Sequence, residues 1–235
     1  FMREVLGFTE LKIPSPEITN IPYLKLAANL FRKVYLSTGA SELWEVGYAI
    51  SLMKTTNPEL DIELMHCVSE YPAPINALNL SAIQTMKDAF QLEVGFSDHS
   101  LGYFGSIAAL TLGASIIEKH VTLDKSMKGP DHKASSTFDE IEIIVEYAKS
   151  IDSMIGNGVK TVSYAEHKNK DLIRKSLYIN AIDLKKGHRI QEDDIACKRP
   201  YIDSLLTPAN YDSIIGKRLR EDMCYDQGIK WQDIE

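Results

Sequence analysis

The sequence has few cysteines and no long hydrophobic segment. Its three cysteines, Cys67, Cys197 and Cys224, are far apart and show no paired metal-ligand spacing. This favours a reduced, cytosolic protein over a disulfide framework. No apolar run approaches the length of a membrane-spanning helix, and the first segment, FMREVLGFTE, lacks the layout of a signal peptide. We therefore expect no membrane association.

An excess of positive charge is also missing. Lysine and arginine number 26 against 33 aspartates and glutamates, which gives a formal net charge of −7. Such a chain has no electrostatic footprint for nucleic acid, so an anionic substrate must be held by local cations. The glycine fingerprint of a dinucleotide site is absent as well. Apolar residues at 44% and charged residues at 25% are ordinary for a globular enzyme.

Short strand-like runs are present and alternate with amphipathic segments of helix length. The runs are LKIPS, KVYLSTG, IELMHC, LEVGFSD and ASIIEKH. Strands that alternate with helices predict βαβ units and a parallel sheet. Such units fit either an open doubly wound sheet or part of a barrel, and the missing glycine fingerprint weakens the doubly wound interpretation.

The pattern also predicts how the chain is divided. We expect an α/β domain over residues 1–156, a polar linker over 157–172 and a small β-rich domain over 173–235. The last domain is too small to bury much surface alone, so we expect it to dock on something. The helical pattern of FMREVLGFTE has no strand before it. This suggests that the chain begins inside a larger fold.

Polar side chains follow every predicted strand. They are Lys12, Ser15 and Glu17; Ser37 and Thr38; His66, Ser69 and Tyr71; Ser97, Asp98 and His99; and Glu118, Lys119 and His120. The carboxyl ends of parallel strands meet at one rim, where α/β proteins hold their active sites. Two imidazoles with oxygen ligands from substrate and water suit a catalytic Mn²⁺ or Mg²⁺ better than a closed zinc site. Lysine and serine side chains are suited to hold phosphate.

Spacing alone leaves other interpretations open. His99 and His120 can be a metal pair or two unrelated structural residues. His66 lies inside an apolar run and is expected to be structural, while Cys67 ends that run and is expected in the core. The loop KGPDHKASS, residues 128–136, has the composition of a solvated turn.

Several motifs, in order, resemble those of the sialic acid synthase family, whose members make N-acetylneuraminate, legionaminate and related nonulosonates. They are LKIPSPEITNIPYLK, VYLSTGASELWEV, HCVSEYPAP, VGFSDHSLG, IIEKHVTLDK and GPDHKAS. The tail, KSLYINAIDLKKGHRIQEDDIACKRP followed by IIGKRL, resembles the family's antifreeze-like (SAF) domain. The resemblance implies a TIM (β/α)8 barrel of which this chain supplies about the last five βα units, followed by the SAF domain.

The resemblance also implies roles for individual residues. His99 and His120 would bind the divalent metal, Mn²⁺ or Mg²⁺, and Glu17 would lie beside the reacting carbons. Phosphoenolpyruvate would be held by Lys12, Ser15, Ser37 and Ser97. The acylated amino sugar would be contacted by Ser69, Tyr71 and Asp131. Arg199 would reach over the sugar from the SAF domain of a partner subunit, in a domain-swapped homodimer.

The implied reaction condenses phosphoenolpyruvate with an N-acetylated amino sugar and water. The sugar would be N-acetylmannosamine or 2,4-diacetamido-2,4,6-trideoxymannose, and the products a nine-carbon 2-keto acid and phosphate. EYPAP and GPDHKAS favour the legionaminate and N-acetylneuraminate branches over the pseudaminate branch. Two alternatives stay open: another metal-dependent barrel lyase or aldolase, which would release no phosphate, and a catalytically incomplete fragment of a synthase.

Overall fold

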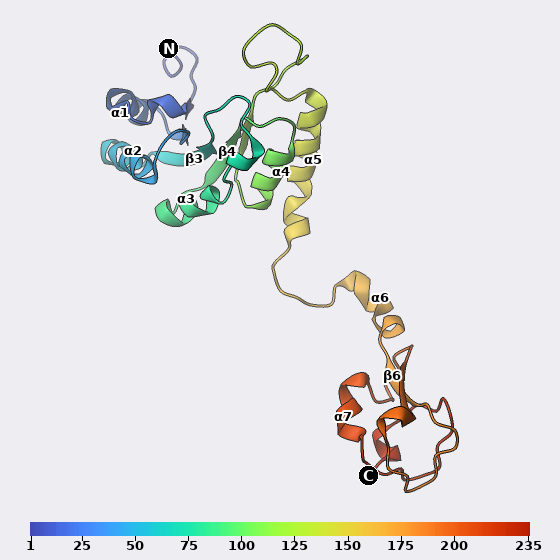
Figure 1. The fold of residues 1–235 in the computed structure, drawn as a ribbon. Helices are drawn as coiled ribbons and strands as arrows, with labels where there is room; N and C mark the ends of the chain where they lie inside the picture. The colour runs from blue at the N-terminus through green and yellow to red at the C-terminus, as the bar shows by residue number, and fades with distance from the viewer. The chain divides into compact units, whose positions relative to one another are not determined.

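The chain divides into two compact units. The computed structural model describes all of residues 1–235. The first unit spans Phe1–Gly158 and the second spans Val159–Glu235 (Figure 1). The boundary between them falls inside the expected linker, residues 157–172, much of which forms helix α6 (Tyr164–Ile173).

The first unit is built on a five-stranded sheet whose strands lie in chain order. Every neighbouring pair is parallel. The strands coincide with the five strand-like runs of the sequence: β1 (Glu10–Ile13), β2 (Lys33–Ser37), β3 (Asp61–Cys67), β4 (Val94–Asp98) and β5 (Ile117–Lys119). A doubly wound sheet reverses its strand order at a switch point, and this sheet has no such reversal.

Helices follow the strands and cover one face of the sheet. They are α1 (Ile21–Leu30), α2 (Leu43–Thr56), α3 (Ala82–Phe90), α4 (Phe104–Thr111) and α5 (Phe138–Ile155). Helices α1 to α4 contribute to one apolar cluster together with Val34, Leu36, Leu64 and Phe96 of the strands. Successive strand residues point to opposite faces, so these alternate residues define the helix-covered face. Helices on a single face are the arrangement of a barrel segment.

The opposite face of the sheet is polar and concave. It carries Lys33, Tyr35, Glu63 and Ser97, which alternate with the apolar residues along the strands. The two edge strands of a flat five-stranded sheet would lie about 19 Å apart, four spacings of roughly 4.8 Å. Yet Lys12 Nζ of β1 lies 3.0 Å from Glu118 Oε2 of β5. The sheet must therefore curl, and we call its inner side the concave face.

The helical pattern of the first eight residues gives only a short turn. Val5 N donates to Phe1 O at 2.9 Å, and no helix precedes β1. Apolar side chains in this segment, including Phe1, Val5 and Phe8, are exposed. A helix of this length is marginal unless its apolar side packs against something.

The second unit is small and β-rich and has its own core. Strands β6 (Ser176–Ile179) and β7 (Ile195–Lys198) pair antiparallel, and α7 (Tyr211–Ile214) lies after them in the chain. The fully buried side chains of this unit include Leu177, Ile179 and Ile190. Single-turn 3₁₀ helices complete both units: Ser15–Glu17, Ile75–Ala77, Glu192–Asp194, Pro208–Asn210 and Trp231–Asp233. None of the helices is long and apolar enough to cross a membrane.

Candidate active site

Three rings from different strand ends meet on the concave face. The Tyr71 ring lies 4.0 Å from the His99 ring and 5.6 Å from the His120 ring, measured between centroids. The two imidazoles are 5.6 Å apart and nearly perpendicular, at 87°. Tyr71 follows β3, His99 follows β4 and His120 follows β5. The structure thus brings together the two histidines that the sequence separates by twenty residues.

His99 is buried and held in one tautomer. Its Nδ1 lies 2.8 Å from Val68 O. A carbonyl oxygen only accepts, so Nδ1 donates its hydrogen and Nε2 keeps a lone pair. Ser97 Oγ is 3.5 Å from that Nε2. Burial, with the neighbouring His120, lowers the pKa of His99 more than the bond to Val68 raises it, so the ring is neutral at neutral pH.

His120 is less constrained. Its Nδ1 lies 3.7 Å from Asp131 Oδ2, and both side chains are partly open to solvent. Asp131 belongs to the loop 128–136, which has the composition of a solvated turn and also contributes to the site.

The two imidazoles form a pair and not a closed cage. No cluster of three or more His, Cys, Asp or Glu side chains is arranged to hold a metal ion. The neutral His99 ring presents a free Nε2, and its other nitrogen is oriented by a backbone carbonyl, which is how metal-binding histidines are usually held. This donor set fits an ion that takes most of its ligands as oxygen from substrate and water, such as Mn²⁺ or Mg²⁺.

Hydroxyl groups converge beside the histidines. Ser15 Oγ accepts a hydrogen bond from Gly39 N at 3.0 Å. A Cβ on Gly39 would overlap Ser69 Oγ and would lie 2.8 Å from Ser15 Oγ. A glycine at this position therefore lets the turn after β2 approach both serines closely.

Ser37 carries an unusual hydroxyl. The side chain is 2% exposed, and its Oγ is a buried polar atom without a hydrogen-bond partner. An unsatisfied buried hydroxyl costs free energy, so such groups call for an explanation. Ser37 ends β2 on the concave face, where a ligand oxygen can supply the missing bond.

Sequence reasoning placed Glu118 at the rim but missed its pairing with Lys12. Glu118 pairs with Lys12 on the concave face, and the alternation in IEKH, which puts Glu118 and His120 on the same face, is the signal that was available. Cys67 is buried in the core as expected, and its Sγ lies 3.7 Å from His99 Nδ1. Burial raises the pKa of the Cys67 thiol, and hydrogen bonds with Ser97 and Ser15 offset part of that rise.

The structural interpretation of His66 is confirmed. Its Nε2 lies 2.7 Å from Leu78 O, and its ring stacks on Phe96 at 5.8 Å. Burial lowers the pKa of His66. The ring is therefore a neutral, hydrogen-bonded packing element.

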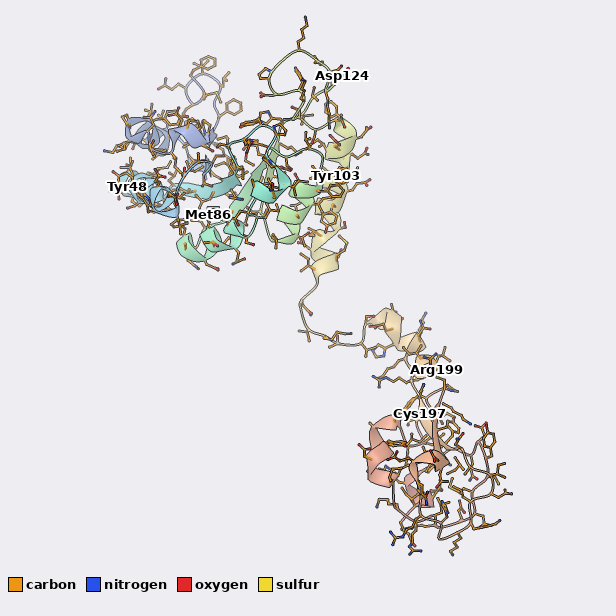
Figure 2. The ribbon with its side chains drawn as sticks, in the orientation of Figure 1. Tyr48, Met86, Tyr103, Asp124, Cys197 and Arg199 are labelled. Atoms are coloured by element: carbon orange, nitrogen blue, oxygen red, sulfur yellow. The ribbon has the colours of Figure 1, made fainter.

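Two further residues expected at the site are Glu17 and Arg199. Glu17 Oε2 accepts a hydrogen bond from Asn20 Nδ2 at 2.6 Å, inside its own turn after β1. Arg199 is exposed in the second unit and stands just past Cys197, at the end of β7 (Figure 2).

Comparison with known proteins gives consistent matches over both units. A model described as NeuB family matches residues 1–160, and a model described as SAF domain matches residues 179–235. An N,N'-diacetyllegionaminic acid synthase of Campylobacter jejuni is 43% identical over 226 residues, which cover 96% of this chain and 67% of that protein. The enzyme of the same name from Legionella pneumophila is 40% identical, over 98% of this chain and 65% of that protein.

A solved structure agrees with these matches. The N-acetylneuraminic acid synthetase of Leptospira borgpetersenii, in complex with citrate, is 36% identical with a TM-score of 0.64. The match covers 70% of this chain and 57% of that one. The chain spans about two thirds of the length of the curated relatives it matches.

Proposed function

Because the chain belongs to the NeuB family and carries a SAF domain, we propose that it acts in a nonulosonate synthase. The proposed reaction joins phosphoenolpyruvate to an N-acetylated amino sugar, with water, and yields a nine-carbon 2-keto acid and phosphate. It is a carbon–carbon bond-forming transfer. The observation that carries the proposal is the pairing of His99 and His120 on the face of the sheet that also holds the unpartnered Ser37 hydroxyl.

Phosphoenolpyruvate would bind along the floor of the concave face. Lys12 supplies a point charge, and Ser15, Ser37 and Ser97 supply hydroxyl donors, the combination that suits a phosphate or carboxylate. Lys12 is paired with Glu118 in the ligand-free chain, with both side chains about one third exposed. Binding of the phosphate would release Lys12 from Glu118.

The histidines would hold the cation, and Tyr71 and Asp131 would face the sugar. Bound there, Mn²⁺ or Mg²⁺ would serve as a Lewis acid that polarises the sugar aldehyde. His99 is prepared for this task by the hydrogen bond from Nδ1 to Val68 O. The Tyr71 ring is tilted by 30° against His99 at 4.0 Å and is half exposed, so it forms a wall against which an acylated sugar can lie.

The remaining chemistry needs a carboxylate and a water. Attack of C3 of phosphoenolpyruvate on the aldehyde carbon forms the new bond and leaves positive charge at C2. Glu17, on the turn that also carries Ser15, would stabilise that charge. Water then adds at C2, and phosphate leaves by cleavage of its C–O bond while Lys12 and the serines hold it.

The assembly is part of the proposal. We propose that the five strands are the last five of a (β/α)8 barrel, because β1 and β5 are both edges of a curled sheet. Residues 1–156 would be the barrel part, 157–172 the linker and 173–235 the SAF domain. Arg199 would close over the sugar bound by a partner subunit in a domain-swapped homodimer.

The legionaminate branch is the proposed substrate class. The two relatives from Campylobacter jejuni and Legionella pneumophila are named N,N'-diacetyllegionaminic acid synthase, which agrees with the preference drawn from EYPAP and GPDHKAS. The sugar would then be 2,4-diacetamido-2,4,6-trideoxymannose, and N-acetylmannosamine would be a poorer substrate.

The test is phosphate release by the full protein with Mn²⁺, phosphoenolpyruvate and either sugar. We expect sugar-dependent release of phosphate together with a 2-keto acid product, abolished by His120→Ala and kept by Lys185→Ala in the second unit. Condensation without phosphate would indicate an aldolase instead. No phosphate with either sugar would refute the synthase proposal.

A further inference from the structure

An ion pair lies directly behind the two histidines. Asp98 ends β4, Lys119 ends β5, and the two are paired in the strand register. Each comes one residue before a histidine, His99 and His120. Because neighbouring strand residues point to opposite faces, the pair lies on the helix-covered face while the imidazoles lie on the concave face.

The pair is buried and held by several hydrogen bonds. Lys119 Nζ lies 2.8 Å from Asp98 Oδ2, and the two side chains are 3% and 0% exposed. Asp98 Oδ1 accepts from Ser100 N at 2.8 Å and from Ser100 Oγ at 2.6 Å, and Oδ2 also accepts from Ser106 Oγ at 2.6 Å. Lys119 Nζ donates further to Ser100 O at 2.8 Å. One carboxylate and one ammonium thus join β4, β5 and α4.

Helix α4 is shaped to approach this pair. A Cβ on Gly105 would lie 2.6 Å from Ser100 Oγ and 3.2 Å from both carboxylate oxygens of Asp98. Only glycine lets the helix come so near the carboxylate without displacing its partners. The close approach puts Ser106 within hydrogen-bonding distance.

A contribution to stability does not by itself explain a buried ion pair at this position. Removing two charges from water costs free energy, and neutral residues of similar volume often replace a buried ion pair without loss of stability. The geometry offers another reason, because the pair fixes where two strand ends stop relative to each other. His120 depends on this most, since its ring has only the 3.7 Å contact with Asp131 as a polar partner.

We infer that the Asp98–Lys119 pair positions His99 and His120 and so sets their affinity for a divalent cation. The inference rests on the proposed function for the identity of the ligand. The structural part of the inference is that the ion pair fixes the distance between the two imidazole rings. This part does not depend on the proposed function. Asp98 and Lys119 are positioning residues, since neither faces the concave side.

The experiment removes both charges together, so that no lone charge is left buried. In the full chain, Asp98→Asn with Lys119→Met is compared with a matched double change, Glu63→Gln with Lys33→Met. The control also joins neighbouring strands of the same sheet, with Lys33 Nζ 2.7 Å from Glu63 Oε2. Each variant is checked for folding by circular dichroism and then titrated with Mn²⁺ by electron paramagnetic resonance.

We expect the first double variant to fold and to bind Mn²⁺ at least tenfold more weakly, the size of effect seen for groups that orient metal ligands. The control should bind as the unchanged chain does. Equal affinity in both variants, or equal weakening in both, overturns the inference.

A second measurement separates this inference from the proposed function. If the unchanged chain binds no Mn²⁺, the proposed metal site fails, and the inference is then judged by proton contacts between the two imidazoles in the cation-free nuclear magnetic resonance spectrum. Their loss in the Asp98→Asn, Lys119→Met variant supports positioning by the pair. Contacts of unchanged intensity overturn it.

Discussion

At the scale of single residues, replacing Ser37 should change the free energy of unfolding and the ligand affinity in opposite directions. Its buried hydroxyl has no partner, so Ser37→Ala removes an unsatisfied group. We expect the free energy of unfolding of the ligand-free protein to rise by about 1 kcal/mol. Phosphoenolpyruvate should nevertheless bind several-fold more weakly, because the hydroxyl is proposed to contact it. Urea unfolding and calorimetric titration measure the two effects.

A matched serine gives the control. Ser176 is fully buried, and its Oγ accepts a hydrogen bond from Ile202 N at 2.9 Å. Ser176→Ala should lower the free energy of unfolding by about 1 kcal/mol, since Ile202 N loses its partner, and should leave ligand affinity unchanged. If Ser37→Ala destabilises the protein as Ser176→Ala does, the hydroxyl has a partner after all.

Some residues of the site are predictable from the sequence and others are not. His99 and His120 follow strand-like runs, so their placement at one rim is predictable, although spacing alone left open whether they form a pair. The ion pair between Lys12 and Glu118 depends on how far the sheet curls, which no local pattern encodes. The contact of Cys67 with His99 is hidden for a related reason, because an apolar run does not reveal which of its residues face the concave side.

At the scale of elements, Gly105 controls how closely α4 meets β4. A Cβ there would meet Ser100 Oγ and the Asp98 carboxylate, so Gly105→Ala should lower the free energy of unfolding by about 1–3 kcal/mol. Gly47 in α2 is the control, because its Cβ would meet only the edge of the Phe90 ring, at 3.2 Å. The gain in helix propensity should make Gly47→Ala nearly neutral. Equal losses in urea unfolding would contradict the close approach at Gly105.

The ion pair between Lys33 of β2 and Glu63 of β3 makes the free energy of unfolding depend on pH. Burial alone would raise the pKa of Glu63, but hydrogen bonds from Lys33 and Ser115 lower it below its ordinary value of 4.5. The folded chain then holds this proton less tightly than the unfolded chain, so the contribution is complete above about pH 4.5 and is lost as the pH falls through the folded pKa.

Replacing Glu63 tests this dependence. Glu63→Gln should flatten the fall in unfolding free energy between about pH 5 and pH 3, as followed by urea titrations across that range. Glu146→Gln, on the exposed side of α5, should leave the slope unchanged. A slope in Glu63→Gln identical to that of the unaltered chain would show that this carboxyl does not couple folding to pH.

The helices and strands differ in how well the sequence predicts them. Each of the five strands of the first unit overlaps one of the strand-like runs of the sequence. Helix α6 lies in a polar stretch and buries none of its residues. Its start depends on a capping box, Ser163 with Glu166, and a composition-based interpretation treats such a stretch as linker. The pattern of the first eight residues shows the converse, since helical periodicity without a packing surface yields only a turn.

At the scale of the whole molecule, the swapped dimer predicts complementation between defective subunits. Arg199→Ala removes the proposed lid residue, and His120→Ala removes a proposed metal ligand, so each variant alone should be nearly inactive. After the two are unfolded and refolded together, half of the dimers are mixed, and each mixed dimer has one intact site. We expect recovery of about a quarter of normal activity, measured as phosphate release.

Two defects in the same barrel should not complement. A mixture of His99→Ala with His120→Ala leaves every barrel defective, so it should stay inactive and serves as the control. Activity of the first mixture no greater than that of its two components would place Arg199 in its own subunit's site or outside any site.

The alternation of helix-facing and concave-face residues along each strand has a practical consequence for redesign. Packing residues and ligand-facing residues alternate, so Val34 and Leu36 serve the helices while Tyr35 and Ser37 serve the concave face. A combinatorial library confined to the concave-face residues would vary the substrate-binding surface and leave the packing against the helices unchanged. The same alternation lets a designer move the concave-face residues onto another sheet, provided that the Asp98–Lys119 pair behind the histidines moves with them.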